Sequence, residues 1–532
     1  MSRVVAVVGG GISGLAAARA LAGGPAVGGP VGSHPAGGLR GSRLAGGPVG
    51  NHPAGERGRG GGRSARGQDI EVVVLEADDR FGGKILSGEF RGRPVELGPD
   101  NFLTRDPSAA ELCRELRLGE DLVPPATSSA SVVARGRLHL LPSGLVLGIP
   151  TDLEALARSG IVSGPGLARA ALDLVRAGAP IRASSVGLHA ATDPGMLPGA
   201  GPSNRDEPEW DAAAILQRRV GREVVERLVD PLLGGINAGC TDRLSLAVVA
   251  PQVARTLVGQ RSVIRALRHL VSNAPADGAS NEAEPLFLGL RGGLSRMVEA
   301  LAADLRDRGV SLRCGTPVTA LRRTGERYKL ETANGTVIAD AIVLATPAHV
   351  GARLLVDDAP AAAAELGSIP YATVVLVTLA WRAGSISRLP QGSGFLVPRC
   401  EGRLLTGCTV MSAKWPQSAS PEEVVIRVSA GRIGDERASS MSDDELVERL
   451  LGELRELVGA PATPLAYLVQ RWPRAFPQYL PGHLRKIERA QAALRELPAL
   501  EIAGALLGGI GIPACVTSGE RAATAVLDRL RE

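Results

Sequence analysis

The sequence contains few aromatic residues, few histidines and no long apolar run. Aromatic residues make up only 3% of its 532 positions, and there are seven histidines. No uninterrupted apolar stretch reaches the ~18 residues that a membrane-spanning helix needs. The chain also opens directly on a strand-like segment, which leaves no room for a signal peptide. We therefore expect a cytoplasmic protein that is soluble or bound peripherally to a membrane.

Cysteine is scarce as well. The six cysteines form no CxxC pair and no metal-binding spacing, and such isolated thiols predict buried core residues in a reducing compartment. His139 and His349 likewise have no second ligand at helical spacing, which favours core or surface roles over metal binding. The sequence thus predicts free thiols and no metal site.

The excess of positive charge is small and partly concentrated in one tract. The formal net charge is +5, and several arginines lie in a glycine- and proline-rich segment over 23–68. Within it, GGPVGSHPAG (28–37) is repeated almost unchanged as GGPVGNHPAG (46–55). Nothing in the two copies could form a core, so we interpret the tract as a disordered surface insertion. A basic arm for nucleic acid would carry interleaved aromatic residues. The tract lacks them, so we expect no nucleic-acid partner.

The most informative segment that is present lies at the N-terminus. A short apolar run, Val4–Val8, leads into the pattern G-x-G-x-x-G of Gly9, Gly11 and Gly14, and an alanine-rich helix follows. In this order the glycines allow a tight turn, close approach of a pyrophosphate and close packing of the helix on the strand. The segment predicts a dinucleotide-dependent enzyme; the alternative is a chance glycine turn.

Pieces of a nucleotide-binding domain recur in three places along the chain. The second strand is expected at Ile70–Glu76, where the Glu76 carboxylate can accept hydrogen bonds from two ribose hydroxyls. The predicted fold class is α/β, with a discontinuous Rossmann-type FAD-binding domain, a mixed-sheet substrate domain and a helical lobe. The first domain comprises residues 1–104, 285–348 and 499–532, and the second comprises 105–284, with the helical lobe, and 349–498.

Hydrophobic periodicity predicts the elements of the second domain. Helices are expected over 153–179, 212–233, 246–271 and 442–458, and strands within 371–410 and 424–430.

Irregular structure is predicted for three segments of the same domain. The proline-flanked run 471–484 is expected to be a rigid loop, 181–208 a mobile loop and 272–285 a polar linker. The apolar face of Leu167–Val175 could meet a membrane surface, although such a face more often packs into a core.

Eight longer motifs cover nearly the whole chain outside 23–68 and 181–208. They are VVGGGISGLAAA (7–18), ELGPDNFLTRDP (96–107), GRLHLLPSGLVLGIPTD (136–152), ERLVDPLLGGINAG (226–239), LRGGLSRMVEAL (290–301), VLATPA (343–348), RWPRAFPQYLPGHL (471–484) and GIGIPACVTSG (509–519). Together they resemble the flavin amine oxidase superfamily and, within it, the oxygen-dependent porphyrinogen oxidases. The combination of GPxxF, RxxPQYxxGH and GIPxC is much more discriminating than the N-terminal glycines.

The resemblance implies that FAD is the cofactor and assigns residues to it by position. The glycine turn would hold the pyrophosphate, Glu76 the adenosine ribose, and the backbone at Val318 would meet the adenine. The last segment would face the pyrimidine end of the flavin, where a helix N-terminus stabilises negative charge. The full set is Gly9, Gly10, Gly11, Ile12, Ser13, Gly14, Glu76, Ala77, Gly83, Lys84, Gly98, Pro99, Asp100, Asn101, Val318, Ile510, Gly511 and Ile512.

The implied reaction is the six-electron oxidation of a porphyrinogen in haem biosynthesis. In each of three rounds a methylene bridge gives hydride to the flavin and a pyrrole N–H loses its proton. O2 then takes the electrons and is released as H2O2. The cofactor carries the hard step, so we assign no catalytic side chain and no general base. A chelatase that acts next on the porphyrin is an expected partner.

Two residues are predicted to contact the substrate, Asp100 and Arg135. Many relatives that oxidise protoporphyrinogen IX carry an arginine where this sequence has Ala130, a few residues before the GRLHLLP segment. Because that arginine would pair with a propionate, its absence favours coproporphyrinogen III as the substrate, giving coproporphyrin III. Protoporphyrinogen IX, giving protoporphyrin IX, is the alternative. Arg135 or Arg137 could replace the missing arginine, although an exposed strand charge explains either one more simply.

Other enzymes of the same fold are the remaining alternatives. An amine oxidase would favour a pair of aromatic residues that cage the amine beside the flavin, and no such pair is evident near 467–512. A carotenoid desaturase would not be expected to carry the PQYxxGH run. A non-catalytic porphyrin carrier would have no need of the glycines, Glu76 and the C-terminal flavin segment.

Overall fold

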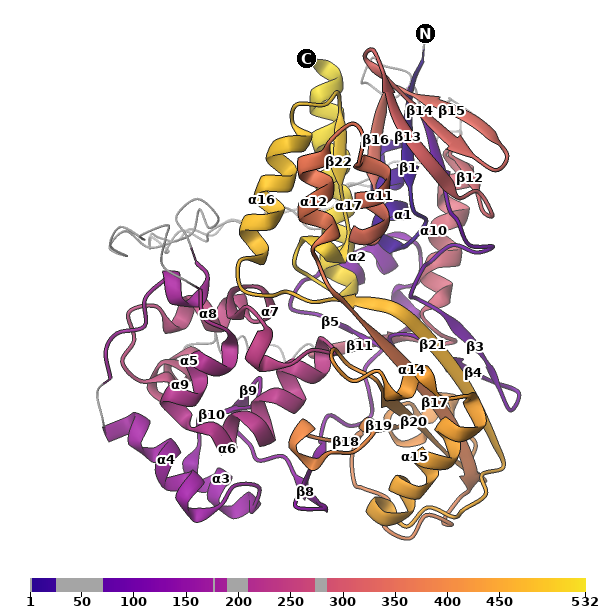
Figure 1. The fold of residues 1–532 in the computed structure, drawn as a ribbon. Helices are drawn as coiled ribbons and strands as arrows, with labels where there is room; N and C mark the ends of the chain where they lie inside the picture. Colours follow the sequence, from indigo (N-terminus) through magenta and orange to yellow (C-terminus); the bar gives the residue numbers. More distant parts are fainter. Residues whose placement is uncertain (1, 25–69, 176–177, 189–208, 273–284) are drawn as a thin grey trace, which may run out of the picture.

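The computed structural model describes residues 2–24, 70–175, 178–188, 209–272 and 285–532. Almost all of the predicted insertion (23–68), most of the predicted loop at 181–208 and most of the linker at 272–285 lie outside the described residues. Figure 1 shows three regions in the described part. One consists of strands and helices and contains both ends of the chain, the second is a cluster of helices, and the third contains a second sheet.

A five-stranded parallel sheet joins distant parts of the chain. The three central strands, β2, β1 and β16, are short runs of mainly β-branched or other apolar residues, as expected for strands covered on both faces. The strand order is β12-β2-β1-β16-β22, with bounds β1 Arg3–Val8, β2 Ile70–Leu75, β12 Ser311–Arg313, β16 Ala341–Leu344 and β22 Leu500–Ile502.

Two layers cover this sheet. Four helices share a hydrophobic core with one face: α1 Ile12–Leu21, α2 Ser108–Glu115, α10 Ser295–Asp307 and α17 Ile512–Arg531. The other face packs on an antiparallel sheet of β13 Val318–Thr324, β14 Arg327–Thr332 and β15 Gly335–Ala339, and on α11 Ala348–Leu355, α12 Pro360–Gly367 and α16 His483–Leu494.

Four of these helices fall almost entirely within the predicted second domain, which was bounded at 104, 348 and 498, yet they pack on the five-stranded sheet. They are α2, α11, α12 and α16. Leu112 of α2 and Leu354 of α11 are buried in the cores of the five-stranded sheet. These four helices therefore share cores with the five-stranded sheet, because burial, not order along the chain, assigns a helix to a core. The division into domains stays a prediction.

The second sheet has seven strands and one helix over a face. Its order is β21-β17-β20-β19-β18-β7-β8. Along β20, Val424, Ile426 and Val428 are buried in alternation and share a core with α15, the Asp443–Val458 helix. Ser442 and Glu445 form a capping box at the start of α15. The strands are β7 Ser131–Ala134, β8 Arg137–Leu140, β17 Tyr371–Arg382, β18 Gly394–Leu396, β19 Leu405–Val410, β20 Glu423–Ala430 and β21 Ala466–Pro477.

The prediction of a rigid loop over 471–484 is wrong for its first half, which belongs to β21. The strand tolerates Pro473 because β21 is at the edge of the sheet and the register shifts opposite it, between Ala372 and Val374. Proline is confined to such edge and bulge positions because it cannot donate a ladder hydrogen bond.

The helical lobe contains shorter helices than predicted. Gly160, with φ of 66°, ends the first, and Gly221, with φ of 90°, interrupts the second. Pro251 starts a new helix where a continuous one was predicted. The helices are α3 Leu153–Ser159, α4 Gly164–Val175, α5 Ala212–Val220, α6 Arg222–Val224, a π-helix Val225–Gly234, α7 Leu246–Val249, α8 Pro251–Leu257 and α9 Val263–Ser272.

The apolar face of α4 is only partly covered. Ala170 is buried, whereas Leu172 is 40% and Val175 81% exposed. Among the described residues, no helix combines the length and the apolar content needed to cross a bilayer.

Four short pairings complete the described strands. The hairpin of β3 Ser87–Phe90 and β4 Arg93–Glu96 ends just before the predicted 98–101 turn. The others are β5 Phe102–Leu103 and β6 Leu122–Val123, which both pair with β11 Phe287–Leu290, and β9 Leu145–Val146 with β10 Ile149–Pro150.

The cysteines are less uniformly buried than predicted. All six are free thiols; Cys113, Cys408 and Cys515 are buried, but Cys400 is exposed. Within the described residues, no group of three or more potential metal ligands gathers.

Candidate functional site

The glycine turn lies at the carboxyl edge of the parallel sheet, between β1 and α1. Gly9 has a φ of 105°, and a Cβ on it would lie 2.6 Å from the Ala345 carbonyl oxygen. A Cβ on Gly14 would lie 1.9 Å from the Gly9 carbonyl oxygen. At Gly11, by contrast, a Cβ would meet no described atom within 4 Å. Two glycines thus allow close packing, and the third leaves the turn open to a ligand.

Glu76 joins the end of β2 to this turn. Its carboxylate accepts hydrogen bonds from the backbone N–H of Gly10, at 2.5 Å, and of Asp78, at 2.9 Å. A carboxylate can accept further hydrogen bonds on its remaining lone pairs. Glu76 is therefore held where the prediction needs an acceptor for ribose hydroxyls. Ala77 follows it, and its side chain is exposed.

The segment 80–84 closes over the glycine turn. The Gly82 N–H donates to the Gly10 carbonyl at 2.8 Å, and a Cβ on Gly83 would lie 3.4 Å from the Gly11 Cα. Arg80 donates to three carbonyl oxygens of its own loop, so its guanidinium holds the loop in shape.

Lys84 is the cation that this loop presents. Its side chain is exposed to solvent, but the protein around it desolvates the ammonium and lowers its pKa. The Lys84 charge also acts on Cys515 at the start of α17 and on His349 of α11. Lys84 thus follows directly on the contact between Gly83 and Gly11, where it can face a phosphate.

The last helix starts beside the same turn. Gly511 is its N-cap and is exposed, with no side chain capping the helix. A Cβ on Gly519 would lie 2.1 Å from the Ser13 carbonyl oxygen, so α17 packs directly on α1. Ile510 is half-buried and Ile512 is buried. An uncapped N-terminus of a 20-residue helix offers N–H donors and a positive dipole end to an anion.

Val318 lies near Glu76 because the backbone two residues before it is hydrogen-bonded to the Glu76 backbone. The Thr316 N–H donates to the Glu76 carbonyl at 2.7 Å. Val318 begins β13 two residues later, next to a register shift in its pairing with β14. The predicted adenine contact is therefore close to the predicted ribose contact.

The turn at 98–101 is fixed from both sides. A Cβ on Gly98 would lie 2.1 Å from the Lys84 carbonyl oxygen, so only glycine fits there. From the seven-stranded sheet, Arg427 donates to the carbonyl oxygens of Glu96 and Gly98 at 3.0 Å each, and the Trp472 indole N–H donates to the Leu97 carbonyl at 2.7 Å. The second sheet thereby positions a turn of the nucleotide-binding region.

Asp100, predicted to contact substrate, is buried in an ion cluster. Its carboxylate accepts from Lys414 Nζ at 2.8 Å and from Trp415 Nε1 at 3.0 Å, and lies 3.2 Å from Arg427 Nη2. Burial alone would raise the pKa of Asp100, but the charges of Arg427 and Lys414 outweigh it and hold that pKa well below the usual range. Pro99 and Asn101 on either side are half-buried.

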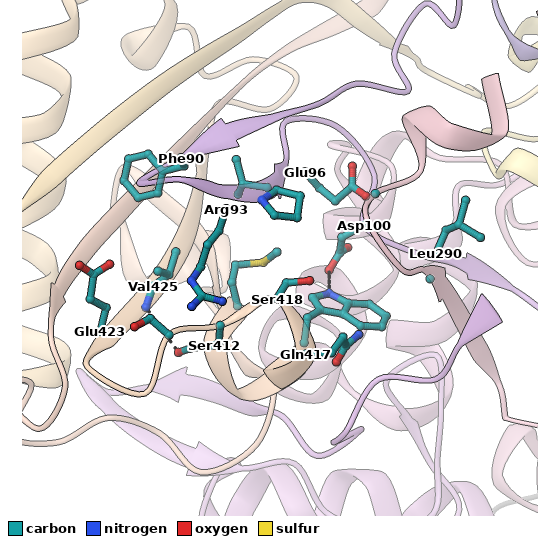
Figure 2. A pocket seen from close by; sticks show the side chains of 18 residues that line it. Phe90, Arg93, Glu96, Asp100, Leu290, Ser412, Gln417, Ser418, Glu423 and Val425 are labelled. Carbon is teal, nitrogen blue, oxygen red and sulfur yellow. Dashed lines mark hydrogen bonds between the residues drawn. The ribbon is translucent and has the colours of Figure 1, made fainter. Parts of the chain in front are cut away.

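Asp100 also lines a pocket, to which none of the glycine-turn residues contributes. Figure 2 shows Asp100 and Glu96 at one side of it, and Ser412, Gln417 and Ser418 at another. The cavity is about 60 Å³, which holds a few water molecules and not a tetrapyrrole. Burial raises the pKa of Glu96 to about 7 against hydrogen bonds from the Ser87 hydroxyl and the Leu294 N–H.

Arg135, the second predicted substrate contact, lies at the edge of the seven-stranded sheet, outside the group of predicted cofactor residues. It occupies the tip of the β7–β8 hairpin with a φ of 51°. Its guanidinium donates to the carbonyl oxygens of Gly160 and Ile161 and lies 3.6 Å from the Glu223 carboxylate. These contacts tie the hairpin to the end of α3 and favour a structural role. The substrate contact stays a prediction.

The structure therefore gathers the predicted cofactor residues at one edge of the parallel sheet and separates Arg135 from them. Sequence reasoning missed Arg427, Lys414 and Trp415. Arg427 lies on the face of β20 opposite the buried Ile426 and Val428. In the sequence this alternation predicts a solvent-facing charge, so no local signal could have identified Arg427. Two side chains of the 471–484 motif are buried rather than exposed to a ligand. The Tyr479 hydroxyl donates to the Ala505 carbonyl, and His483 Nε2 is hydrogen-bonded to the Leu506 carbonyl.

The chain is similar to known proteins over most of its length. The family model for flavin containing amine oxidoreductase matches residues 12–527. The chain is 32% identical to the coproporphyrinogen III oxidase of Bacillus subtilis strain 168, over 87% of this chain and 92% of that one. It is 33% identical to the coproporphyrinogen III oxidase of Mycobacterium tuberculosis H37Rv, over 88% and 94%. A crystal structure from Exiguobacterium sp. 255-15, described as a candidate protoporphyrinogen oxidase, superimposes with a TM-score of 0.76 at 27% identity, covering all of both chains.

Proposed function

Because this chain belongs to the flavin containing amine oxidoreductase family, it is an FAD-dependent oxidoreductase, and we propose that its substrate is coproporphyrinogen III. The observation that carries the proposal is the gathering of Gly11, Glu76, Lys84 and Gly511 at one sheet edge. The two curated relatives compared above are coproporphyrinogen III oxidases, matched over 87% and 88% of this chain, whereas a protoporphyrinogen oxidase from Bos taurus is 29% identical over 86% of it.

The residues at the sheet edge fit FAD. We propose that the five-stranded sheet is a Rossmann-type FAD domain, as its parallel strand order suggests. The open face at Gly11 would receive the pyrophosphate, with Lys84 neutralising its charge. Glu76 would accept the ribose hydroxyls, and the N–H groups around Gly511 would face the negatively charged end of the reduced ring. When bound, FAD supplies the two-electron acceptor that dehydrogenation requires.

The protein's own part in the reaction is to orient the macrocycle against the cofactor and to exclude competing chemistry. We propose that the 98–101 turn does this from the substrate side. Arg427 and Trp472 fix its carbonyl groups, and Gly98 brings its backbone against Lys84. We assign no general base, because a porphyrinogen is electron-rich and loses its pyrrole protons readily.

Protoporphyrinogen IX is the second candidate substrate. The missing arginine at Ala130 favours the substrate with four propionates, and the 32–33% identity to coproporphyrinogen III oxidases supports the same choice. An amine oxidase is less well supported: Tyr371 and Tyr479 both use their hydroxyls in hydrogen bonds with backbone groups, and Tyr479 is only 1% exposed. O2 as acceptor with release of H2O2, the chelatase partner and the cytoplasm stay predictions from the resemblance.

The test is anaerobic reduction of the bound flavin by each substrate. Purified protein is mixed with coproporphyrinogen III or protoporphyrinogen IX in parallel, and bleaching of the flavin absorbance is followed. Faster bleaching by coproporphyrinogen III supports the proposal, and faster bleaching by protoporphyrinogen IX transfers it to the second candidate. If flavin is bound and neither substrate bleaches it, the porphyrinogen proposal is wrong.

A further inference from the structure

A second pocket lies at the far end of β20, outside the cofactor site. It is formed by the short 3-10 turn Arg399–Glu401 and by the loop from β20 into α14, which spans Arg437–Ser440. The cavity is about 380 Å³, within the ~300–1,000 Å³ typical of small-molecule sites. It is lined by Arg399, Gly402, Arg432, Gly434, Asp435, Glu436 and Arg437.

Arg432 is the unusual member of this pocket. Its side chain is only 9% exposed, yet none of the described residues forms a hydrogen bond with its guanidinium, and Nε is fully buried. The nearest carboxylate is Asp435, at 4.0 Å. Nearly all buried polar groups in proteins are hydrogen-bonded, and a buried charge without a partner is costly. Among the described residues, the Arg432 guanidinium therefore has no hydrogen-bond acceptor.

Asp435 is not that acceptor, because Arg437 occupies it. Arg437 donates from Nε to one carboxylate oxygen at 2.8 Å and from Nη2 to the other at 2.7 Å. This two-point geometry is the strong form of an arginine–carboxylate pair. The Asp435 charge is thus committed to Arg437, and Arg432 is left with a distant, weak interaction.

Arg399, which lines the same cavity, also has a buried N–H without a hydrogen-bond partner among the described residues. Its Nη2 donates to the carbonyl oxygens of Gly239 and Ile433, at 3.2 and 3.3 Å, but its buried Nε has no partner among the described residues. Burial and the charges of Arg399 and Arg437 lower the pKa of Arg432, against the charges of Asp435 and Asp230. The pocket is therefore short of negative charge.

We propose that this pocket binds an oxyanion, a carboxylate or phosphate group of a small molecule, which accepts hydrogen bonds from Arg432 and Arg399. The planar fork of arginine matches both groups and gives them two-point recognition. The site is independent of the reaction proposed above. Its ligand could be a free metabolite or a propionate-bearing tetrapyrrole, since both carry the same recognised group.

Isothermal titration of the FAD-loaded full chain at low ionic strength tests the proposal. Phosphate, citrate and coproporphyrin III are titrated separately into wild type, Arg432→Met and Arg158→Met. Arg158 serves as the control, since it is 71% exposed, lies on α3 and, within the described residues, forms an ion pair with Glu154 alone. We expect one of the three ligands to saturate a site that weakens at least tenfold in Arg432→Met and is unchanged in Arg158→Met.

The three ligands separate the two sources. Binding of phosphate or citrate identifies a free anion. A second coproporphyrin III site, lost in Arg432→Met while the first persists, identifies a propionate. The proposal is overturned if no ligand saturates a site in wild type up to millimolar concentration, or if Arg432→Met binds as wild type does.

Thermal unfolding separates a ligand site from a structural role. Arg432 loses no internal hydrogen bond on substitution, so ligand-free Arg432→Met should melt at or above the wild-type temperature. A clearly lower melting temperature would mean that Arg432 holds the fold, which contradicts the proposal. If Arg432→Met does not fold, Arg432→Lys keeps the charge and the aliphatic stem, and its anion affinity should still fall because the fork is lost.

Discussion

Replacing Asp100 with asparagine distinguishes a structural role from a substrate contact. The amide can still accept the Trp415 N–H, but it no longer neutralises Lys414 and Arg427. Those two cations are only 15% and 10% exposed and lie 2.8 and 3.2 Å from the carboxylate. Asp100→Asn therefore leaves two largely buried positive charges side by side without the carboxylate that neutralises them, although Arg427 keeps its hydrogen bonds to the Glu96 and Gly98 carbonyl oxygens.

The expected cost is large. Removing one member of a buried ion pair typically destabilises a protein by about 3–5 kcal/mol, because the remaining charge stays desolvated. We expect Asp100→Asn to fall in this range. The matched control is Asp357→Asn, which breaks an ion pair with Arg322 whose side chains are 51% and 49% exposed. Exposed pairs contribute about 0–1 kcal/mol, so the control should unfold almost as wild type does.

The assay is urea unfolding of the FAD-loaded protein, followed by circular dichroism and flavin fluorescence, together with the KM for coproporphyrinogen III. Adding Arg427→Met to Asp100→Asn should restore part of the lost stability, since it removes one unpaired charge. The structural reasoning fails if Asp100→Asn unfolds at the same urea concentration as Asp357→Asn. A raised KM in that case would return Asp100 to the substrate site.

Two further changes test the cofactor site and the pocket behind it. Gly14→Ala places a Cβ 1.9 Å from the Gly9 carbonyl oxygen. The purified variant should therefore carry less than about a tenth of the wild-type FAD, measured by absorbance. The control is Gly452→Ala inside α15, where the Cβ meets open space, and this variant should keep all of its FAD. The pKa of Glu96 is raised from 4.5 to about 7, so the folded state holds a proton that the unfolded state releases between these values. The free energy of unfolding should therefore fall by at most about 3 kcal/mol as pH rises from 4.5 to 7. Glu96→Gln should flatten this part of the stability profile, and an unchanged slope would show that Glu96 is ionised throughout.

The sequence by itself determined the parts whose signals are local. The order of apolar strand, spaced glycines and helix at residues 4–21 requires a particular backbone turn, and only glycine satisfies it at Gly9 and Gly14. The acid at the end of β2 was likewise predicted from its position after an apolar strand, although a long tract separates it from the turn. The helix over 442–458 was predicted from periodicity and is confirmed as α15 with its capping box.

Only the tertiary structure decided which distant residues meet. No periodicity links Asp100 with Lys414, Arg427 and Trp415, over 300 positions away. Packing alone brings these side chains into one ion cluster, and the substrate contact of Asp100 stays a prediction. Hydrophobic periodicity predicted helices that continue through Gly160 and Gly221. In the structure both residues have a positive φ that ends the helix, and this conformation is known only from the tertiary structure. Arg432 shows the same limit: its type was evident from the sequence, but whether a partner satisfies its charge depends on everything packed around it.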